Sequence, residues 1–115
     1  MNKILLHIEG FVVFVLCIYF YGYFDFSWLL FLILLLSPDL AILGFLLNNK
    51  IGTIVYNIFH TYTTSLITIF LGFLLSIPTI LAIGLIWTAH IGMDRMVGYG
   101  LKYLNDFKDN HLNRV

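Results

Sequence analysis

The sequence predicts an all-α fold, a four-helix transmembrane bundle, and three observations lead to this class. The chain has 115 residues, of which 61% are hydrophobic and only 10% are charged. Its six basic and six acidic side chains are too few to cover the core of a water-soluble domain, so its surface must face lipid. The apolar residues also form long runs, each close to the length, about 20 residues, that a helix needs to cross a bilayer.

These runs divide the chain into four predicted spans within a single membrane domain, 1–115. The spans cover about residues 4–24, 27–48, 51–75 and 78–99, and a cytoplasmic polar tail follows over about 100–115. The turns between them are short, and each is polar or contains proline, which suits antiparallel helices. No small-residue cleavage site follows the first run, so we expect it to be retained rather than removed as a signal peptide.

The second span has a defect near its middle, at Ser37-Pro38-Asp39. Pro38 cannot donate a backbone hydrogen bond, and it disfavours helix in the residue before it. The same residues make a good helix start, with Ser37 as the cap and Asp39 beside the exposed amide groups. We therefore predict a span that is kinked here or broken into two half-helices. Irregular backbone at this depth is buried in protein or lines a wet cavity. The alternative is an ordinary proline kink without a ligand.

The basic residues determine the predicted orientation, because loops rich in Lys and Arg stay in the cytoplasm. The first and third loops contain neither residue type. The basic residues outside the spans lie at the N-terminus, in the second loop and in the tail: Lys3, Lys50, Lys102, Lys108 and Arg114. Four spans with both termini inside satisfy this pattern, and an odd number of spans does not. We expect a multi-pass protein of the cell (inner) membrane with both termini cytoplasmic.

Several polar side chains lie inside the predicted spans, where each charge costs about 2.5–3.5 kcal/mol. They are Glu9, Asp39, Asn57, His60, His90, Asp94 and Arg95. With a rise of about 1.5 Å per residue, every span places such a group in the cytoplasmic half of the bilayer. His90 and Asp94, four residues apart, share one face of the last span. We therefore expect these side chains to converge.

Two histidines and two carboxylates are suitable ligands for a divalent metal such as zinc, manganese or iron. We predict Asp39, His60, His90 and Asp94 as the ligands. Asn57 and Arg95 are predicted to support these ligands from behind, as hydrogen-bond or charge partners. A metal with an open coordination position activates water for hydrolysis, and Glu9 is the predicted general base. The predicted substrate is a lipid or another molecule embedded in the membrane.

Two other functions fit the same residues. In the first, the protein is a structural or interaction protein without enzymatic activity, and a salt-bridge network locks the bundle, with Arg95 neutralising Asp39, Glu9 or Asp94. In the second, the histidines and carboxylates form an ion or proton path. Four short helices enclose little space, so a pore would require a homo-oligomer. The formal net charge of zero and the lack of a basic block exclude a nucleic-acid partner.

The same polar residues carry a family resemblance. The segments concerned are 6–10, 38–40, 56–62, 89–95, 98–103 and 107–112. They are similar to the bacterial family numbered 4260 among the domains of unknown function, over almost the whole chain. The resemblance implies a small multi-pass bacterial membrane protein and supplies no activity. In the tail the family has Thr before the histidine, where this chain has Asn110 before His111. The order Pro-Asp, His and His-x-x-x-Asp also resembles that of membrane-bound hydrolases thought to depend on metal.

Overall fold

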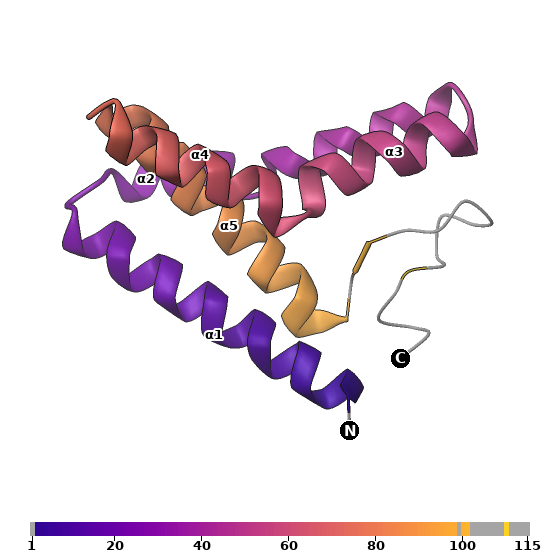
Figure 1. Ribbon diagram of the computed structural model, residues 1–115, viewed down its shortest axis with the longest axis horizontal. Coiled ribbons are helices and arrows are strands. Elements are labelled where there is room, and N and C mark those ends of the chain that lie inside the picture. The colour runs from indigo at the N-terminus through magenta and orange to yellow at the C-terminus, as the bar shows by residue number, and fades with distance from the viewer. Residues whose placement is uncertain (1, 99, 102–109, 111–115) are drawn as a thin grey trace.

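The computed structural model of the chain describes residues 2–98, 100, 101 and 110 (Figure 1). Most of the predicted polar tail, including His111, lies outside these residues. The regular elements of the described part are helical, so the predicted all-α class is confirmed there. They are α1 (Asn2–Tyr23), α2 (Trp28–Leu34), the 3₁₀ helix η1 (Ser37–Leu46), α3 (Asn49–His60), α4 (Tyr62–Leu74) and α5 (Pro78–Val97).

Two helices, α1 and α5, are each long and apolar enough to cross a membrane. Helices α3 and α4 meet the same criterion as a pair, although they are bent by 43° at the residue between them. The second predicted span is divided at the predicted place, since α2 ends at Leu34 and η1 begins at Ser37 with Pro38 in its first turn. The third predicted span is also divided, at Thr61, which the sequence analysis did not predict. Only the first and last predicted spans are therefore single helices.

The distribution of side chains is the reverse of that in a water-soluble protein. On α3, Thr53, Tyr56 and His60 are buried, whereas Ile54 and Ile58 on the opposite face are exposed. Large apolar side chains are likewise exposed along α1, α2 and α4. Contiguous exposed apolar surface of this kind indicates contact with lipid, and polar groups inside it belong in the protein interior. The fold and its apolar helices thus indicate a membrane protein.

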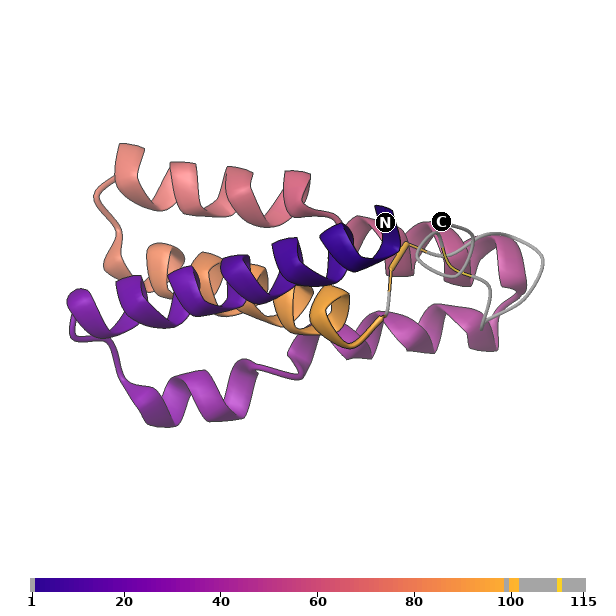
Figure 2. The ribbon, with the colours of Figure 1, turned by 90° about the horizontal axis from the view of Figure 1, so that it is seen from below.

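Helix α5 is the centre of the fold and lies between α1 and α4 (Figures 1 and 2). Glycines allow both contacts to be close. A Cβ on Gly92 of α5 would lie 2.8 Å from the Gly10 carbonyl oxygen of α1, and a Cβ on Gly84 would lie 2.9 Å from the Ile69 backbone nitrogen of α4. Small residues at helix contacts are the usual means of close packing between helices in membranes. This packing buries most of α5, including His90 and Asp94.

The connections between elements gather at two ends of the molecule. The links from α1 to α2 and from α4 to α5 lie at one end, and the N-terminus, the η1–α3 turn and the end of α5 lie toward the other (Figures 1 and 2). Helices η1 and α3 pack on each other and extend together away from the rest of the fold (Figure 1). The bend at Thr61 and the break before Ser37 therefore lie where this pair joins the other helices.

Candidate metal centre

Four side chains from three elements converge at the point where the η1–α3 pair joins α5. Asp39 comes from the first turn of η1, His60 is the last residue of α3, and His90 and Asp94 lie one turn apart on α5. One ligand atom from each residue can be chosen so that all four lie within 4.8 Å of one another. These are the four residues that the sequence analysis predicted as ligands, and their arrangement could hold a metal ion.

The distances within this cluster agree with those of a tetrahedral site. The Nε2 atoms of His60 and His90 are 3.2 Å apart. Asp39 Oδ1 lies 3.2 Å from His60 Nε2 and 3.1 Å from His90 Nε2, and Asp94 Oδ2 lies 3.5 Å and 3.2 Å from the same two atoms. Zinc binds nitrogen and oxygen ligands at about 2.0–2.2 Å, so tetrahedral geometry sets two such ligands about 3.3–3.6 Å apart. The five separations above are close to this range, and the set as a whole lies within 4.8 Å.

A backbone hydrogen bond determines which nitrogen of His60 faces the cluster as an acceptor. His60 Nδ1 lies 2.9 Å from the Tyr56 carbonyl oxygen, and the two rings stack with centroids 3.8 Å apart. A carbonyl oxygen can only accept, so Nδ1 carries the hydrogen and donates it. In the neutral ring Nε2 then carries no hydrogen, and its lone pair points toward the cluster. Histidine ligands of metals are commonly held in this way by a backbone carbonyl.

Without a cation the cluster brings together atoms that repel one another. The ionised carboxylates of Asp39 and Asp94 can only accept hydrogen bonds, and so can the Nε2 atom of a neutral His60. A proton on His90 Nε2 would have three acceptors at 3.1–3.2 Å, and it can point toward only one of them. A divalent cation would interact with all four atoms at once and would neutralise two carboxylates that lie in an apolar surrounding.

The break at Thr61 positions His60 within the cluster. Thr61 has an extended backbone, with φ −97° and ψ 141°, so α3 ends at His60. The carbonyl groups released at this end are bound by side chains rather than by the helix. Thr64 Oγ1 donates to the Ile58 oxygen, Trp87 Nε1 to the Phe59 oxygen at 2.6 Å, and Arg95 Nη2 to the His60 oxygen at 3.0 Å. These bonds satisfy carbonyl groups at the end of α3, where the chain has no proline or glycine.

Arg95 contacts the backbone of a candidate ligand. Its guanidinium donates a hydrogen bond to the His60 carbonyl oxygen and lies 5.6 Å from the centre of the Tyr62 ring, and its predicted support of the ligands stays a prediction. A positive side chain at the C-terminal end of a helix is favourable, because the helix dipole places partial negative charge there. Arg95 is more than nine-tenths buried, and it contacts the candidate ligand His60 at the backbone carbonyl of that residue.

The remaining predicted residues lie around the cluster and not within it. Glu9 is exposed on α1 and is not among the four residues whose ligand atoms converge, so its role as a general base stays a prediction. Asn57 is half-buried on α3, three residues before His60. Sequence reasoning missed Tyr56 and Trp87, because both act through hydrogen bonds that involve the backbone. For Trp87, the one signal in the sequence was its position three residues before His90.

The cluster is open on one side. The side chains of His60 and His90 are 0% exposed and that of Asp94 is 11% exposed, whereas that of Asp39 is 41% exposed. Any water molecule or substrate would therefore reach the cluster at Asp39. Among the described residues no group forms a hydrogen bond with His90 Nδ1, although this atom is buried.

The fold and the cluster together define a class, a helical membrane protein with a buried group of two histidines and two aspartates. The comparison with protein families agrees with the resemblance noted from the sequence. The chain belongs to the family described as Domain of unknown function (DUF4260), which matches residues 3–115. No curated protein and no solved structure matches the chain.

Proposed function

We propose that this protein is a four-span membrane protein that binds a divalent metal through Asp39, His60, His90 and Asp94 and uses it for hydrolysis. The observation that carries the proposal is the convergence of the four ligand atoms within 4.8 Å of one another. Residues distant in sequence supply them, so helical spacing alone does not account for the arrangement. Two buried histidines that face two carboxylates supply nitrogen and oxygen ligands of the kinds that divalent metals bind.

The proposed topology counts α2 with η1 as one broken span and α3 with α4 as another. The arrangement of the connections supports it, because the α1–α2 and α4–α5 links share one end of the molecule (Figure 2). Lys3 at the start of α1 and Lys50 at the start of α3 belong to the other end. The positive-inside rule assigns this end to the cytoplasm, in the cell (inner) membrane, with both termini inside.

The ligand set favours zinc over the other metals. Two imidazoles and two carboxylates suit zinc, manganese and iron, but the separations of 3.1–3.5 Å between the imidazole nitrogens and the carboxylate oxygens are close to those of tetrahedral coordination, which zinc prefers in proteins. Manganese would favour more oxygen ligands in an octahedral arrangement. The hydrogen bond from His60 to the Tyr56 carbonyl and the bond from Arg95 to the His60 carbonyl support the ligand from behind.

The open side at Asp39 supports a catalytic rather than a purely structural site. Structural zinc sites are closed by four protein ligands, and catalytic sites keep one position for water. Asp39 is the most exposed member of the cluster and comes from the short helix η1, so it is the ligand that solvent or substrate can displace. Water bound to a divalent metal is a stronger acid than bulk water, which provides hydroxide for hydrolysis near neutral pH.

Elemental analysis of the full chain tests the metal site. The protein is purified in a mild detergent without chelators, and its metals are measured against protein concentration. We expect about one divalent ion per chain in the wild type, and the same in Glu9→Gln, which changes a carboxylate outside the cluster. A wild-type protein without stoichiometric metal would overturn the proposal and favour a salt-bridge network that only locks the bundle.

Hydrolysis and conduction are separated by two further measurements on the metal-loaded protein. Hydrolysis should stop when a chelator removes the metal and should return when zinc is added back. Ion flux into vesicles that contain the protein should equal that into empty vesicles, because the proposed site is a single cluster that opens on one side and not a path across the membrane. Flux above the empty vesicles would favour the conducting alternative.

A further inference from the structure

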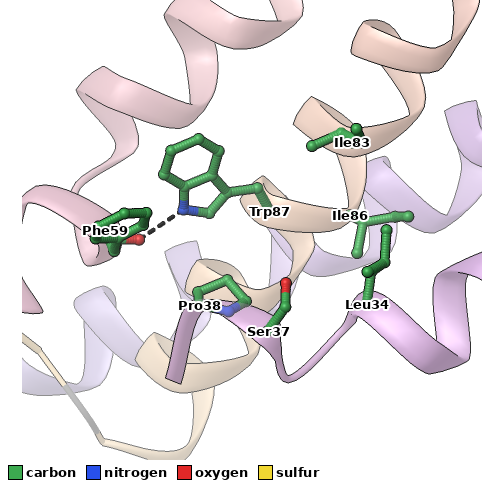
Figure 3. A pocket seen from close by; sticks show the side chains of 7 residues that line it. All are labelled: Leu34, Ser37, Pro38, Phe59, Ile83, Ile86 and Trp87. Atoms are coloured by element: carbon green, nitrogen blue, oxygen red, sulfur yellow. Dashed lines mark hydrogen bonds between the residues drawn. The ribbon is translucent and has the colours of Figure 1, made fainter. Parts of the chain in front are cut away.

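An apolar cavity of about 200 Å³ lies beside the candidate metal centre (Figure 3). Its lining comes from both broken spans and from the central helix. The lining side chains that the argument uses are Leu34 of α2, Pro38 of η1, Phe59 of α3, and Ile83, Ile86 and Trp87 of α5. The cavity is therefore located where the break before Ser37 and the bend at Thr61 both face α5.

The cavity and the cluster share their backbone. Pro38 directly precedes Asp39, and Phe59 directly precedes His60. Ile86 is one helical turn before His90. Neighbouring residues along a chain have Cα atoms about 3.8 Å apart, so the backbone beside the cavity also carries three of the four candidate ligands, although none of the four is among the residues that line it. A molecule in the cavity would thus lie beside the proposed metal site.

The chemistry of the lining favours a hydrocarbon occupant. The Trp87 N–H, a polar group of the lining, already donates to the Phe59 carbonyl at 2.6 Å (Figure 3). Ser37 supplies the one hydroxyl, and the other lining side chains are apolar. A polar headgroup would lose its hydration here without gaining hydrogen bonds, whereas an alkyl chain would gain the free energy of burial.

The mouth of the cavity lies on the surface that faces lipid. Phe59 is 41% exposed and adjoins the exposed Ile58 on α3, and Ile83 of α5 is 39% exposed. An occupant would therefore enter sideways from the bilayer, and its polar end would stop at the open side of the cluster, near Asp39. Entry from water would require a polar opening, which this lining does not offer.

We propose that this cavity receives the acyl chain of a membrane lipid and places the carboxylic ester of that chain at the metal. This inference rests on the proposed function. In the reaction, the oxygen of one water molecule forms a bond to the acyl carbon, and the bond from that carbon to the alcohol oxygen breaks. The alcohol oxygen takes a proton of the water, and the fatty acid releases its remaining proton to solvent. No electrons are exchanged with another molecule.

A photoreactive lipid tests the occupant without requiring activity. The probe is a phosphatidylcholine with a diazirine on the acyl chain close to the ester, incorporated into nanodiscs with the wild-type protein. We expect cross-links to Phe59, Ile83 and Trp87, identified by mass spectrometry. In Ile83→Trp, which fills the cavity from its exposed wall, we expect these cross-links to fall by about tenfold.

A second apolar cavity of about 350 Å³, between α1, α4 and α5, supplies the matched control. Leu66 lines it and is exposed, as Ile83 is in the first cavity, but the metal-ligand cluster does not border it. Leu66→Trp should leave labelling of the first cavity unchanged. Equal labelling in wild type and Ile83→Trp would overturn the inference.

The products identify the bond that is cleaved. Zinc-loaded protein in phosphatidylcholine vesicles should release fatty acid and lysophosphatidylcholine in equal amounts, and Ile83→Trp should lower this rate while it keeps its zinc. Release of phosphocholine or phosphatidic acid would overturn the inference and leave the proposed metal hydrolase intact. If the protein holds no metal but the photoreactive lipid still labels the cavity, the proposed function is overturned, and binding of an acyl chain in the cavity is still supported.

Discussion

The Nε2 atoms of His60 and His90 lie 3.2 Å apart, although the two residues are 30 positions apart in the chain. His60 is fixed from behind by the Tyr56 carbonyl, and both imidazoles also face Asp39 and Asp94. Two nitrogen atoms at this distance share a proton or a cation, since two lone pairs there would repel each other.

Removal of either imidazole should abolish metal binding. In His60→Ala and His90→Ala we expect zinc affinity to fall by at least about 100-fold, more than is typical when only a supporting hydrogen bond is lost. Competition with a chromogenic chelator in detergent measures it. His7 is the matched control, because its Nδ1 contacts the Met96 carbonyl at 2.8 Å, away from the cluster. His7→Ala should keep wild-type affinity, and retention of zinc by both cluster variants would contradict the ligand set.

Acidification should release the metal. Histidine binds metal only when it is neutral, so protons compete with zinc at two imidazoles and, at lower pH, at two carboxylates. Zinc affinity should therefore decrease as the pH is lowered. Equilibrium dialysis over a pH series measures this dependence. An affinity that rises on acidification would contradict binding through neutral imidazoles.

The convergence of the four candidate ligands could be predicted from the sequence because depth along a helix is simple to count. The same count gave the depth of Glu9 equally well, but not the direction in which the side chain points. Gly10 packs against α5 within reach of the Arg95 Cβ, and a helix turns by about 100° per residue, so Glu9 points elsewhere and is exposed.

The break at Thr61 was also beyond prediction, since it depends on hydrogen bonds from Trp87 and Arg95 in another helix and not on a local proline or glycine.

Loss of the Arg95 guanidinium should weaken the metal site without removing a ligand. Arg95→Met retains much of the side chain's volume but leaves the His60 carbonyl without this buried donor, so we expect about 10–100-fold weaker zinc binding. Arg95→Lys keeps a positive charge and should restore part of the affinity. Chelator competition gives the affinities, and thermal unfolding of the zinc-free proteins shows how much of the effect is general destabilisation. Wild-type zinc affinity in Arg95→Met would contradict a positioning role.

The contact between α1 and α5 should tolerate no side chain at Gly92. A Cβ there would lie 2.8 Å from both the Gly10 carbonyl oxygen and the Phe14 backbone nitrogen, so the two helices would have to separate. We expect Gly92→Ala to cost about 1–3 kcal/mol of stability. The control is Gly22→Ala, whose Cβ would meet only the Trp28 ring, at 3.3 Å. Unfolding in mixed micelles measures both variants. Equal stability of Gly92→Ala and wild type would contradict this packing.

The proposed topology predicts which loops face the cytoplasm. The Cys17→Ala background removes the only native cysteine. Ser76 lies in the α4–α5 link, and Asn48 precedes α3 at the opposite end, so Ser76→Cys and Asn48→Cys each introduce one cysteine at one end of the molecule. Four spans with both termini inside place position 76 outside and position 48 inside. An impermeant maleimide added to intact cells should therefore label Ser76→Cys only, and permeabilised cells should show labelling of both. Labelling of Asn48→Cys in intact cells would contradict the orientation, and labelling of both would contradict four spans.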